Sequence, residues 1–432
     1  MRLSMAFILF LALFISWQTT IWHWKEKAVN FLSNPFRRSR IPQFILDAQH
    51  PWIIENKNKL ERLRDAESYL CSSLTRSATD DLREKLGGGE HGLDVPPDLF
   101  DYLEIDNGRL GVDRPGWPNA LMRLRELNRC PASLSHVKTF KTSIFAHRGQ
   151  YSDWDKRILE PLQPPKEVLD LFADVLEHMT SLENLIWVVP SSDAPYFEAN
   201  FIYRGLILPS VKRLEPGTMC HFLARLCPNI NVLENQAWRS SQESDVMLLQ
   251  ETKFASNLAR FAMVASWGWT KPMLQDLVSL VPGIQSLGLW GSLDHRTRDP
   301  DDSDSESSTL KESLKILRSL QNLTHLDLAD ASKLDVGWDG GPWCGNAFFG
   351  PRGRRYQRRV ARKRAEAVDR VAAVVLEVLP RLTGFSVGGS QAEIIRYENG
   401  TLRAKFAWTG RMDEWALSAV PRHPGELDEG IY

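Results

Sequence analysis

Ser386 lies in a motif that could carry catalysis, because residues 384–388 match the pattern G-x-S-x-G. In serine hydrolases this pattern forms a sharp strand-to-helix turn that exposes the serine, and an acidic residue and then a histidine follow along the chain. After Ser386 the sequence holds one histidine, His423, with Asp413 before it and Asp428 after it. So short a remainder cannot complete the sheet that would orient a triad. A serine hydrolase using Ser386 is therefore kept only as a second alternative.

Other catalytic and metal-binding patterns are missing from the sequence. It contains neither the phosphate-binding pattern G-x-x-x-x-G-K-[ST] nor the zinc pattern H-E-x-x-H, and its five cysteines form no C-x-x-C pair. Residues 87–92 satisfy G-x-G-x-x-G, but they follow a predicted helix, whereas a dinucleotide site requires a preceding strand. We therefore expect a protein that is not an enzyme, with no catalytic residue, no metal ligand and no cofactor.

Regularly spaced leucines make up a more informative pattern. From Leu314 to Leu323 an apolar residue recurs at every third position, and the spacing then changes to alternation at Leu326 and Leu328. The first spacing buries one face of a helix, and the second buries one face of a short strand. A helix–turn–strand unit of this size cannot bury its apolar face alone, so it must stack on similar units.

Similar units recur along the chain. Residues 176–187, 277–289 and 375–387 repeat the spacing closely, and weaker copies begin near positions 134, 208, 226 and 257. The residues expected to open successive strands are Leu185, Leu214, Leu233, Phe261, Leu287, Leu326 and Phe385. The first four intervals are 29, 19, 28 and 26 residues, in or near the period of about 20–29 residues that leucine-rich repeats show. The last two, 39 and 59 residues, indicate insertions between repeats.

From Leu134 to Ser390 the chain resembles an irregular leucine-rich-repeat solenoid of the kind found in fungal F-box-associated repeat proteins. It departs from the strict repeat after the strands, where Ala329 and Trp290 stand in place of the usual asparagine or cysteine. The predicted fold class is α/β: an irregular leucine-rich-repeat-like solenoid with an N-terminal helical region and an N-terminal hydrophobic segment. Ordinary amphipathic helices in an unrelated α/β domain are the alternative, because the spacing Leu-x-x-Leu is common.

The N-terminal hydrophobic segment is expected to contact a membrane. Residues 3–24 contain no charged residue, and residues 5–15 are continuously apolar. This length fits an uncleaved transmembrane anchor, whereas the apolar stretch and Arg2 also fit a secretory signal. Basic residues such as Lys25, Lys27 and Arg37 follow the segment and favour a single-pass protein with a cytoplasmic body. The glycosylation sequons at Asn322 and Asn399 leave secretion after signal cleavage as the alternative.

The region that follows is predicted to be helical. Helices are expected over residues 53–74 and 79–86, the second ending at the glycines of positions 87–89. Residues 95–103, from Val95 to Leu103, are similar to the proline-capped helix that opens an F-box, which would make the chain a substrate adaptor of a ubiquitin ligase. A plain N-terminal cap for the repeats explains the same residues without a ligase.

We divide the chain into a hydrophobic segment (1–24), a helical region (25–130), a repeat region (131–400) and a C-terminal tail (401–432). Insertions are expected at 294–309 and 335–370. The first contains the acidic residues Asp299 to Glu306, and the second contains the basic run Arg352 to Arg364. If the two insertions leave the stack on the same face, the acidic segment shields the basic run.

Composition favours protein as the partner. The formal net charge is −1, so no overall field attracts nucleic acid, and none is expected to bind. The expected function is a membrane-associated, non-catalytic scaffold that binds another protein on its stacked strands. Residues that point outward from those strands, or directly follow them, are the predicted contacts: Ile186, Gly288, Trp290, Asp327 and Asp330.

Overall fold

The computed structural model describes residues 51–66, 101–106, 117–129, 131–144, 163–235, 240–293, 308–342 and 344–424. The expectations for residues 1–24, for the helix at 79–86 and for the acidic segment Asp299–Glu306 therefore lie outside the described residues. Within the described residues, no helix is long and apolar enough to cross a membrane.

In the described residues, strands alternate with helices, and the strands form one sheet of 11 strands whose order in the sheet equals their order in the chain. The strands are β1 (Tyr102–Asp106), β2 (Thr139–Ser143), β3 (Asn184–Val188), β4 (Arg213–Pro216), β5 (Val232–Asn235), β6 (Arg260–Val264), β7 (Ser286–Trp290), β8 (His325–Leu328), β9 (Gly384–Val387), β10 (Ser390–Arg396) and β11 (Leu402–Lys405). Neighbouring strands from β1 to β9 run parallel. β10 and β11 continue the sheet antiparallel. The predicted α/β class is confirmed.

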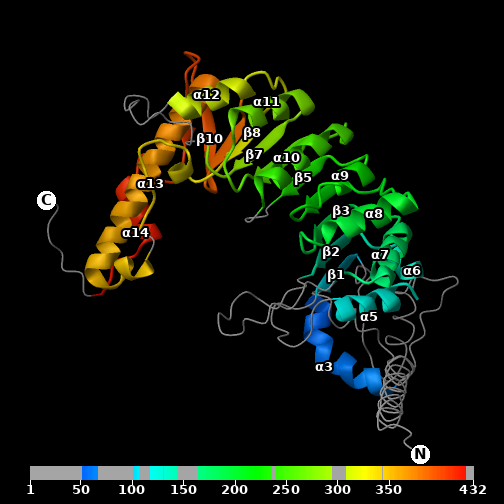
Figure 1. Cartoon of the computed structure of the whole chain (residues 1–432). Coiled ribbons are helices and arrows are strands. Elements are labelled where there is room, and N and C mark those ends of the chain that lie inside the picture. Colours follow the sequence, from blue (N-terminus) through cyan, green and yellow to red (C-terminus); the bar gives the residue numbers. More distant parts are fainter. Residues whose placement is uncertain are drawn as a thin grey trace, which may run out of the picture.

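Helices connect the strands and lie along the outer side of the curved sheet, whereas the strands line the inner side (Figure 1). The α-helices are α3 (Pro51–Ala66), α5 (Trp117–Leu127), α6 (Pro131–Leu134), α7 (Lys166–His178), α8 (Ala194–Arg204), α9 (Leu223–Leu226), α10 (Gln242–Glu251), α11 (Lys271–Leu280), α12 (Ser308–Leu317), α13 (Gly350–Val378) and α14 (Met412–Ala419). Short 3-10 helices are η1 (Thr252–Phe254), η2 (Ala331–Lys333) and η3 (Gly345–Phe348).

The local sequence explains where these helices begin and end. The hydroxyl of Thr270 accepts a hydrogen bond from the backbone N–H of Met273 at the start of α11, and Ser241 caps α10 in the same way. Such caps satisfy N–H groups that have no partner inside the helix. At the end of α8, Gly205 adopts a left-handed conformation with φ of 66°, which glycine adopts without steric cost.

The hydrophobic core lies between the sheet and the outer helices. Every strand-opening residue predicted from the repeats is the second residue of its strand, and these side chains are buried in one continuous row: Leu185, Leu214, Leu233, Phe261, Leu287, Leu326 and Phe385. Alternate residues of a strand point to opposite faces. The register of the row therefore places the residues on either side of each member on the inner face of the sheet.

An aromatic cluster fills the core behind strands β3 and β4. Trp187 contacts Phe172, Phe197 and Phe201 edge-on, with ring centroids 5.0, 5.4 and 5.6 Å apart. All four side chains are fully buried. Edge-to-face contact is a favoured geometry for aromatic rings. The cluster joins β3 to the helices α7 and α8 that cover it.

Several segments differ from the sequence-based expectations. Residues 102–106 form the edge strand β1, and Leu103 is buried, so the F-box-like segment does not end as a docking helix; its residues 95–100 lie outside the described range. Residues 401–424, expected to be a tail, include β11 and α14. Residues 350–370, which lie within the insertion expected at 335–370, form the first part of the 29-residue helix α13. The predicted helix at 53–74 corresponds to α3, of which residues 51–66 are described.

A candidate partner-binding face

The inner face of the sheet carries charged side chains on strands β4, β5, β6 and β8 that contact one another across the sheet. On β4, Arg213 contacts Glu215 at 2.8 Å and also forms an ion pair with Glu234 on β5. On β6, Arg260 contacts Glu234 at 2.6 Å and Asp327 of β8 at 3.4 Å. We call these five residues, together with Ser386, the charge ladder.

Ser386 forms the last rung of the charge ladder. Its Oγ donates a hydrogen bond to Oδ1 of Asp327 at 2.8 Å. The serine lies inside strand β9, which a hairpin joins to β10, so it is not in the strand-to-helix turn that the hydrolase pattern requires. Its hydroxyl contacts a carboxylate directly, without the intervening histidine of a catalytic triad. The geometry gives Ser386 a place in the ladder, with a carboxylate as the partner of its hydroxyl.

The charges of the ladder are held in fixed positions. Only 5 % of the Glu234 side chain is exposed, and it bridges two arginines. Partial burial acts to lower the pKa of Arg213, but the hydrogen bond to Glu215 and the charge of Glu234 raise it above its ordinary value. Charge-assisted contacts of this kind are shorter and stronger than neutral hydrogen bonds. The inner face therefore presents a preorganised pattern of alternating charge.

The residues predicted as contacts lie at different places on this face. Gly288 and Asp327 are cross-strand neighbours on β7 and β8, and Trp290 lies at the end of β7. Ile186 is half-buried on β3, between Lys141 of β2 and Glu215 of β4. Lys141 itself pairs with Glu104 of β1 at 2.7 Å. The structure thus brings Gly288, Trp290 and Asp327 together and leaves Ile186 four strands away.

Gly288 has a packing role in addition to its position on the face. A Cβ atom at this glycine would lie 2.6 Å from Cβ of Ala262 and 3.4 Å from the ring of Trp290. Gly288 is buried, whereas Trp290 is half-exposed. The small residues at 262 and 288 therefore leave room for the indole of Trp290 to pack beside them, and Trp290 remains half-exposed.

Asp330 is engaged in the fold itself. Its carboxylate forms an ion pair with Arg364 of α13 at 2.7 Å and accepts hydrogen bonds from the backbone and the hydroxyl of Ser332. Arg364 also donates to the carbonyl of Gly388 at 3.0 Å. Asp330 therefore ties the end of β8 to α13, and a contact with a partner would compete with these bonds.

The arginines of the ladder were not among the predicted contacts, because every predicted contact lies after a strand-opening residue. Arg213 and Arg260 directly precede Leu214 and Phe261. Residues on both sides of a core-facing strand residue point to the opposite face. The pattern Arg-apolar-Glu at 213–215 carries this signal, whereas at 260–262 only Arg260 does, because Ala262 is apolar and buried.

A buried carboxylate holds the turn that follows β6. Asp245 of α10 is 1 % exposed, and its Oδ2 accepts a hydrogen bond from the backbone N–H of Ser266 at 3.3 Å. Its other oxygen, Oδ1, has no hydrogen-bond partner among the described residues. Burial raises the pKa of Asp245, and hydrogen bonds from Ser240 and Ser266 only partly oppose this. The charged form is therefore less favourable in the folded protein than in the unfolded chain.

Replacing Asp245 by asparagine is expected to stabilise the protein at neutral pH, by on the order of 1 kcal/mol. Because the folded pKa lies above the unfolded one, the native state loses stability as pH rises through the folded pKa. The stabilisation by Asp245→Asn should thus be present at pH 7. It should shrink toward zero below the pKa of an aspartate in the unfolded chain, about 3.9. Urea unfolding of both proteins across pH measures it, and a pH-independent difference would contradict the assignment.

No model of a protein family matches the chain, and no curated protein matches it in sequence. The charge ladder and its neighbours therefore have to be interpreted from their own geometry. Within the described residues, no group of three or more histidine, cysteine, aspartate or glutamate side chains could hold a metal ion.

Proposed function

We propose that the chain is a non-catalytic scaffold, built as an irregular leucine-rich-repeat-like solenoid, that binds another protein on the inner face of its sheet. The observation that carries the proposal is the charge ladder, which crosses six neighbouring strands on the face opposite the helices. The chain-order arrangement of the strands supports the solenoid, because each unit then packs mainly on its neighbours.

The chemistry of the inner face suits a protein surface. Its fixed alternating charges can match the polar groups of a partner and select its register. Trp290 lies beside them and offers an aromatic surface, the kind of side chain that often dominates binding energy at interfaces. We place the contact at Gly288, Trp290, Asp327 and Arg260, with Ile186 at the margin. Asp330 contributes by orienting β8.

Membrane attachment through residues 3–24, with the body in the cytoplasm, belongs to the same proposal and rests on the apolar segment and the basic residues that follow it. Secretion after signal cleavage is the alternative. Asn322 and Asn399 are both exposed, so a glycan on either of them in cells would establish a lumenal or secreted body.

Site-specific crosslinking in cells tests which face binds. A photoreactive amino acid at position 186 or 290 is expected to crosslink to a discrete partner protein, whereas the same group at position 203 is not. Tyr203 is the matched control because it is 91 % exposed and lies on the outer helix α8. Crosslinks obtained from position 203 alone would place the partner on the outer face and refute the proposal.

Trp290→Ala is expected to weaken binding of the crosslinked partner by more than tenfold, because truncating an interface tryptophan typically costs about 2 kcal/mol or more. Tyr203→Ala should leave the affinity unchanged. Both affinities are measured by titration with the purified partner, and unchanged thermal unfolding confirms that each variant is folded. A Trp290→Ala protein with wild-type affinity would remove this residue from the interface.

A further inference from the structure

The first half of α13 extends beyond the sheet and is rich in arginine (Figure 1). Several of its basic residues are used inside the fold. Arg358 is 9 % exposed and donates to the carbonyl of Val420 at 3.3 Å, Arg362 pairs with Asp413 at 2.8 Å, and Arg364 holds Asp330. These arginines fasten α13 to α14 and to β8, so they are not available to an external partner.

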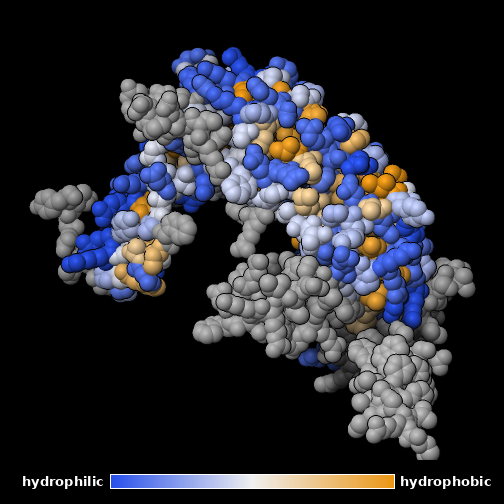
Figure 2. Space-filling model, viewed as in Figure 1, coloured by the Kyte–Doolittle hydropathy of each residue, from blue (hydrophilic) through white to orange (hydrophobic). Residues whose placement is uncertain are grey.

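Three other basic residues of α13 form a separate exposed stripe. Arg352, Arg359 and Lys363 are exposed, and no carboxylate of the described residues pairs with them. Intervals of seven and four residues place the three on one side of the helix, over a length of about 16 Å. Figure 2 shows hydrophilic residues gathered along this part of the molecule. We call Arg352, Arg359 and Lys363 the basic stripe.

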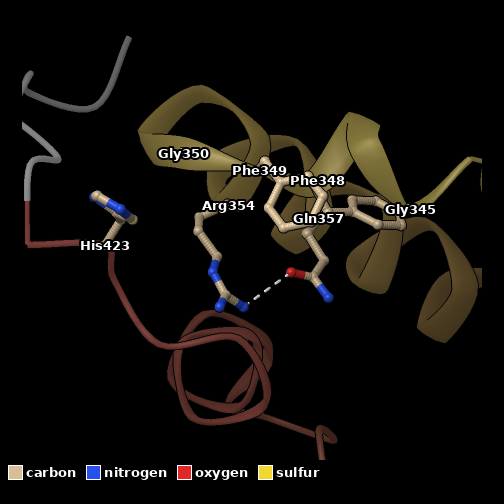
Figure 3. A pocket seen from close by; sticks show the side chains of 7 residues that line it. All are labelled: Gly345, Phe348, Phe349, Gly350, Arg354, Gln357 and His423. Carbon is tan, nitrogen blue, oxygen red and sulfur yellow. Dashed lines mark hydrogen bonds between the residues drawn. The ribbon is translucent and has the colours of Figure 1, made fainter.

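An exposed phenylalanine lies at the start of the helix that carries the basic stripe. Phe349, directly before α13, is 75 % exposed. It borders a shallow cavity of about 320 Å³ that is also lined by Phe348, Arg354, Gln357 and His423 (Figure 3). Arg354 is exposed and donates a hydrogen bond to Gln357 at 3.2 Å. Cationic and apolar side chains therefore share one end of α13.

We propose that the basic stripe and Phe349 form a docking surface for an anionic phospholipid membrane. A negatively charged bilayer attracts lysine and arginine side chains near its surface, each strengthening binding by about fivefold. A protruding aromatic side chain can enter the boundary between headgroups and acyl chains. The three cations and Phe349 supply both interactions on a surface distinct from the charge ladder.

The geometry favours a lipid surface over a nucleic-acid strand. Single-stranded nucleic acid binds in positively charged grooves where bases stack on free aromatic faces. The basic stripe lies on the convex surface of a helix. Tyr356, the aromatic residue among its cations, is already stacked on Phe348 with centroids 5.9 Å apart. The guanidinium of Arg359 lies 5.8 Å from the same ring. A flat anionic surface requires neither a groove nor a free ring face.

A fluorescent reporter at Cys344 can follow docking in the full chain. Cys344 is exposed, free and five residues before Phe349, whereas Cys220 and Cys227 are buried and burial raises the pKa of the Cys220 thiol to about 12. The full chain carrying Cys71→Ser and Cys130→Ser is labelled on Cys344 with an environment-sensitive dye. The labelled protein is then placed in nanodiscs of phosphatidylcholine, with or without about one-third phosphatidylserine. We expect a blue shift with phosphatidylserine only, reversed by 0.5 M salt because screening shortens the electrostatic range to roughly 4 Å.

Charge variants identify the groups responsible. The triple variant Arg352→Gln, Arg359→Gln, Lys363→Gln should lower the docking constant by about 100-fold and abolish the shift. The variant Phe349→Ser should reduce the spectral shift. The matched control, Lys212→Gln, Lys315→Gln, Arg318→Gln, removes the same charge from exposed positions elsewhere and should retain the shift. Equal spectra in the two lipids, or a shift that survives the triple variant, would overturn the proposal. So would single-stranded RNA that binds through the stripe while phosphatidylserine gives no response.

Discussion

Replacing Trp187 by alanine is expected to lower the free energy of unfolding by about 4 kcal/mol. The indole is fully buried and contacts three phenylalanines from helices α7 and α8. Removing it leaves a cavity that these rings cannot fill without leaving their favoured edge-on geometry. Equilibrium unfolding in urea measures the loss, and hydrogen exchange should locate it in β2, β3 and β4, because a stacked unit is coupled mainly to its neighbours.

Trp187→Phe is the matched control for this prediction. Within the part of the chain that the structure describes, the Trp187 Nε1–H group is buried without a hydrogen-bond partner, and burying such a donor costs about 1–3 kcal/mol. Phenylalanine removes this penalty, but it also removes part of the ring. The free energy of unfolding should therefore change by about 1 kcal/mol or less. If the alanine and phenylalanine variants lost equal stability, the aromatic packing would not be the source of the effect.

The sequence predicted the strands correctly where burial on one face produces a regular apolar pattern. Leu185, Leu287 and Leu326 were predicted as strand-opening residues from the spacing of the leucines, and all three lie in the buried row of the sheet. The pattern reports burial directly because an apolar residue in water is costly wherever it lies in the chain. The position of each strand in the sheet then follows from its order in the chain, because successive units lie next to each other.

The helical structure of the first half of α13, which lies within the insertion expected at 335–370, was not predicted because its burial involves polar chemistry. Residues 350–364 bury Gly353 and Arg358 and use arginine hydrogen bonds to fasten the helix, so they show no apolar rhythm. The hairpin β10–β11 was missed for a related reason. One face of its strands is half-buried and the other is exposed at the end of the sheet. The alternation of apolar and polar residues in β11 covers only four residues, which is a weak signal for a strand.

The charge ladder could be found only by joining residues that lie far apart in sequence. Arg260 and Asp327 are separated by 67 positions and meet because β6 and β8 flank β7, where Gly288 carries no side chain between them. Sequence spacing alone could not supply the sheet register that places them side by side. Once the register is known, the residue before each strand-opening position becomes as informative as the residue after it.

Glu234→Ala is expected to cost about 2–3 kcal/mol of stability and to weaken partner binding as well. Its carboxylate is 5 % exposed and bridges Arg213 and Arg260, so its removal leaves two guanidinium groups facing each other. Breaking a fully buried ion pair costs about 3–5 kcal/mol; the arginines here are 42 % and 39 % exposed, and solvent screening reduces the penalty.

Glu215→Ala separates the role of the bridge from a general loss of charge. Glu215 contacts Arg213 and is 23 % exposed, so its removal should cost less than about 1 kcal/mol. A double-mutant cycle between Glu234→Ala and Arg260→Ala should give a coupling energy of about 1–2 kcal/mol. If the ladder positions Arg260 for a partner, Glu234→Ala must lower affinity in a protein that remains folded, whereas Glu215→Ala must lower it less. Equal losses of affinity in the two glutamate variants would mean that the partner senses net charge, and that the fixed arrangement of the ladder is not what it recognises.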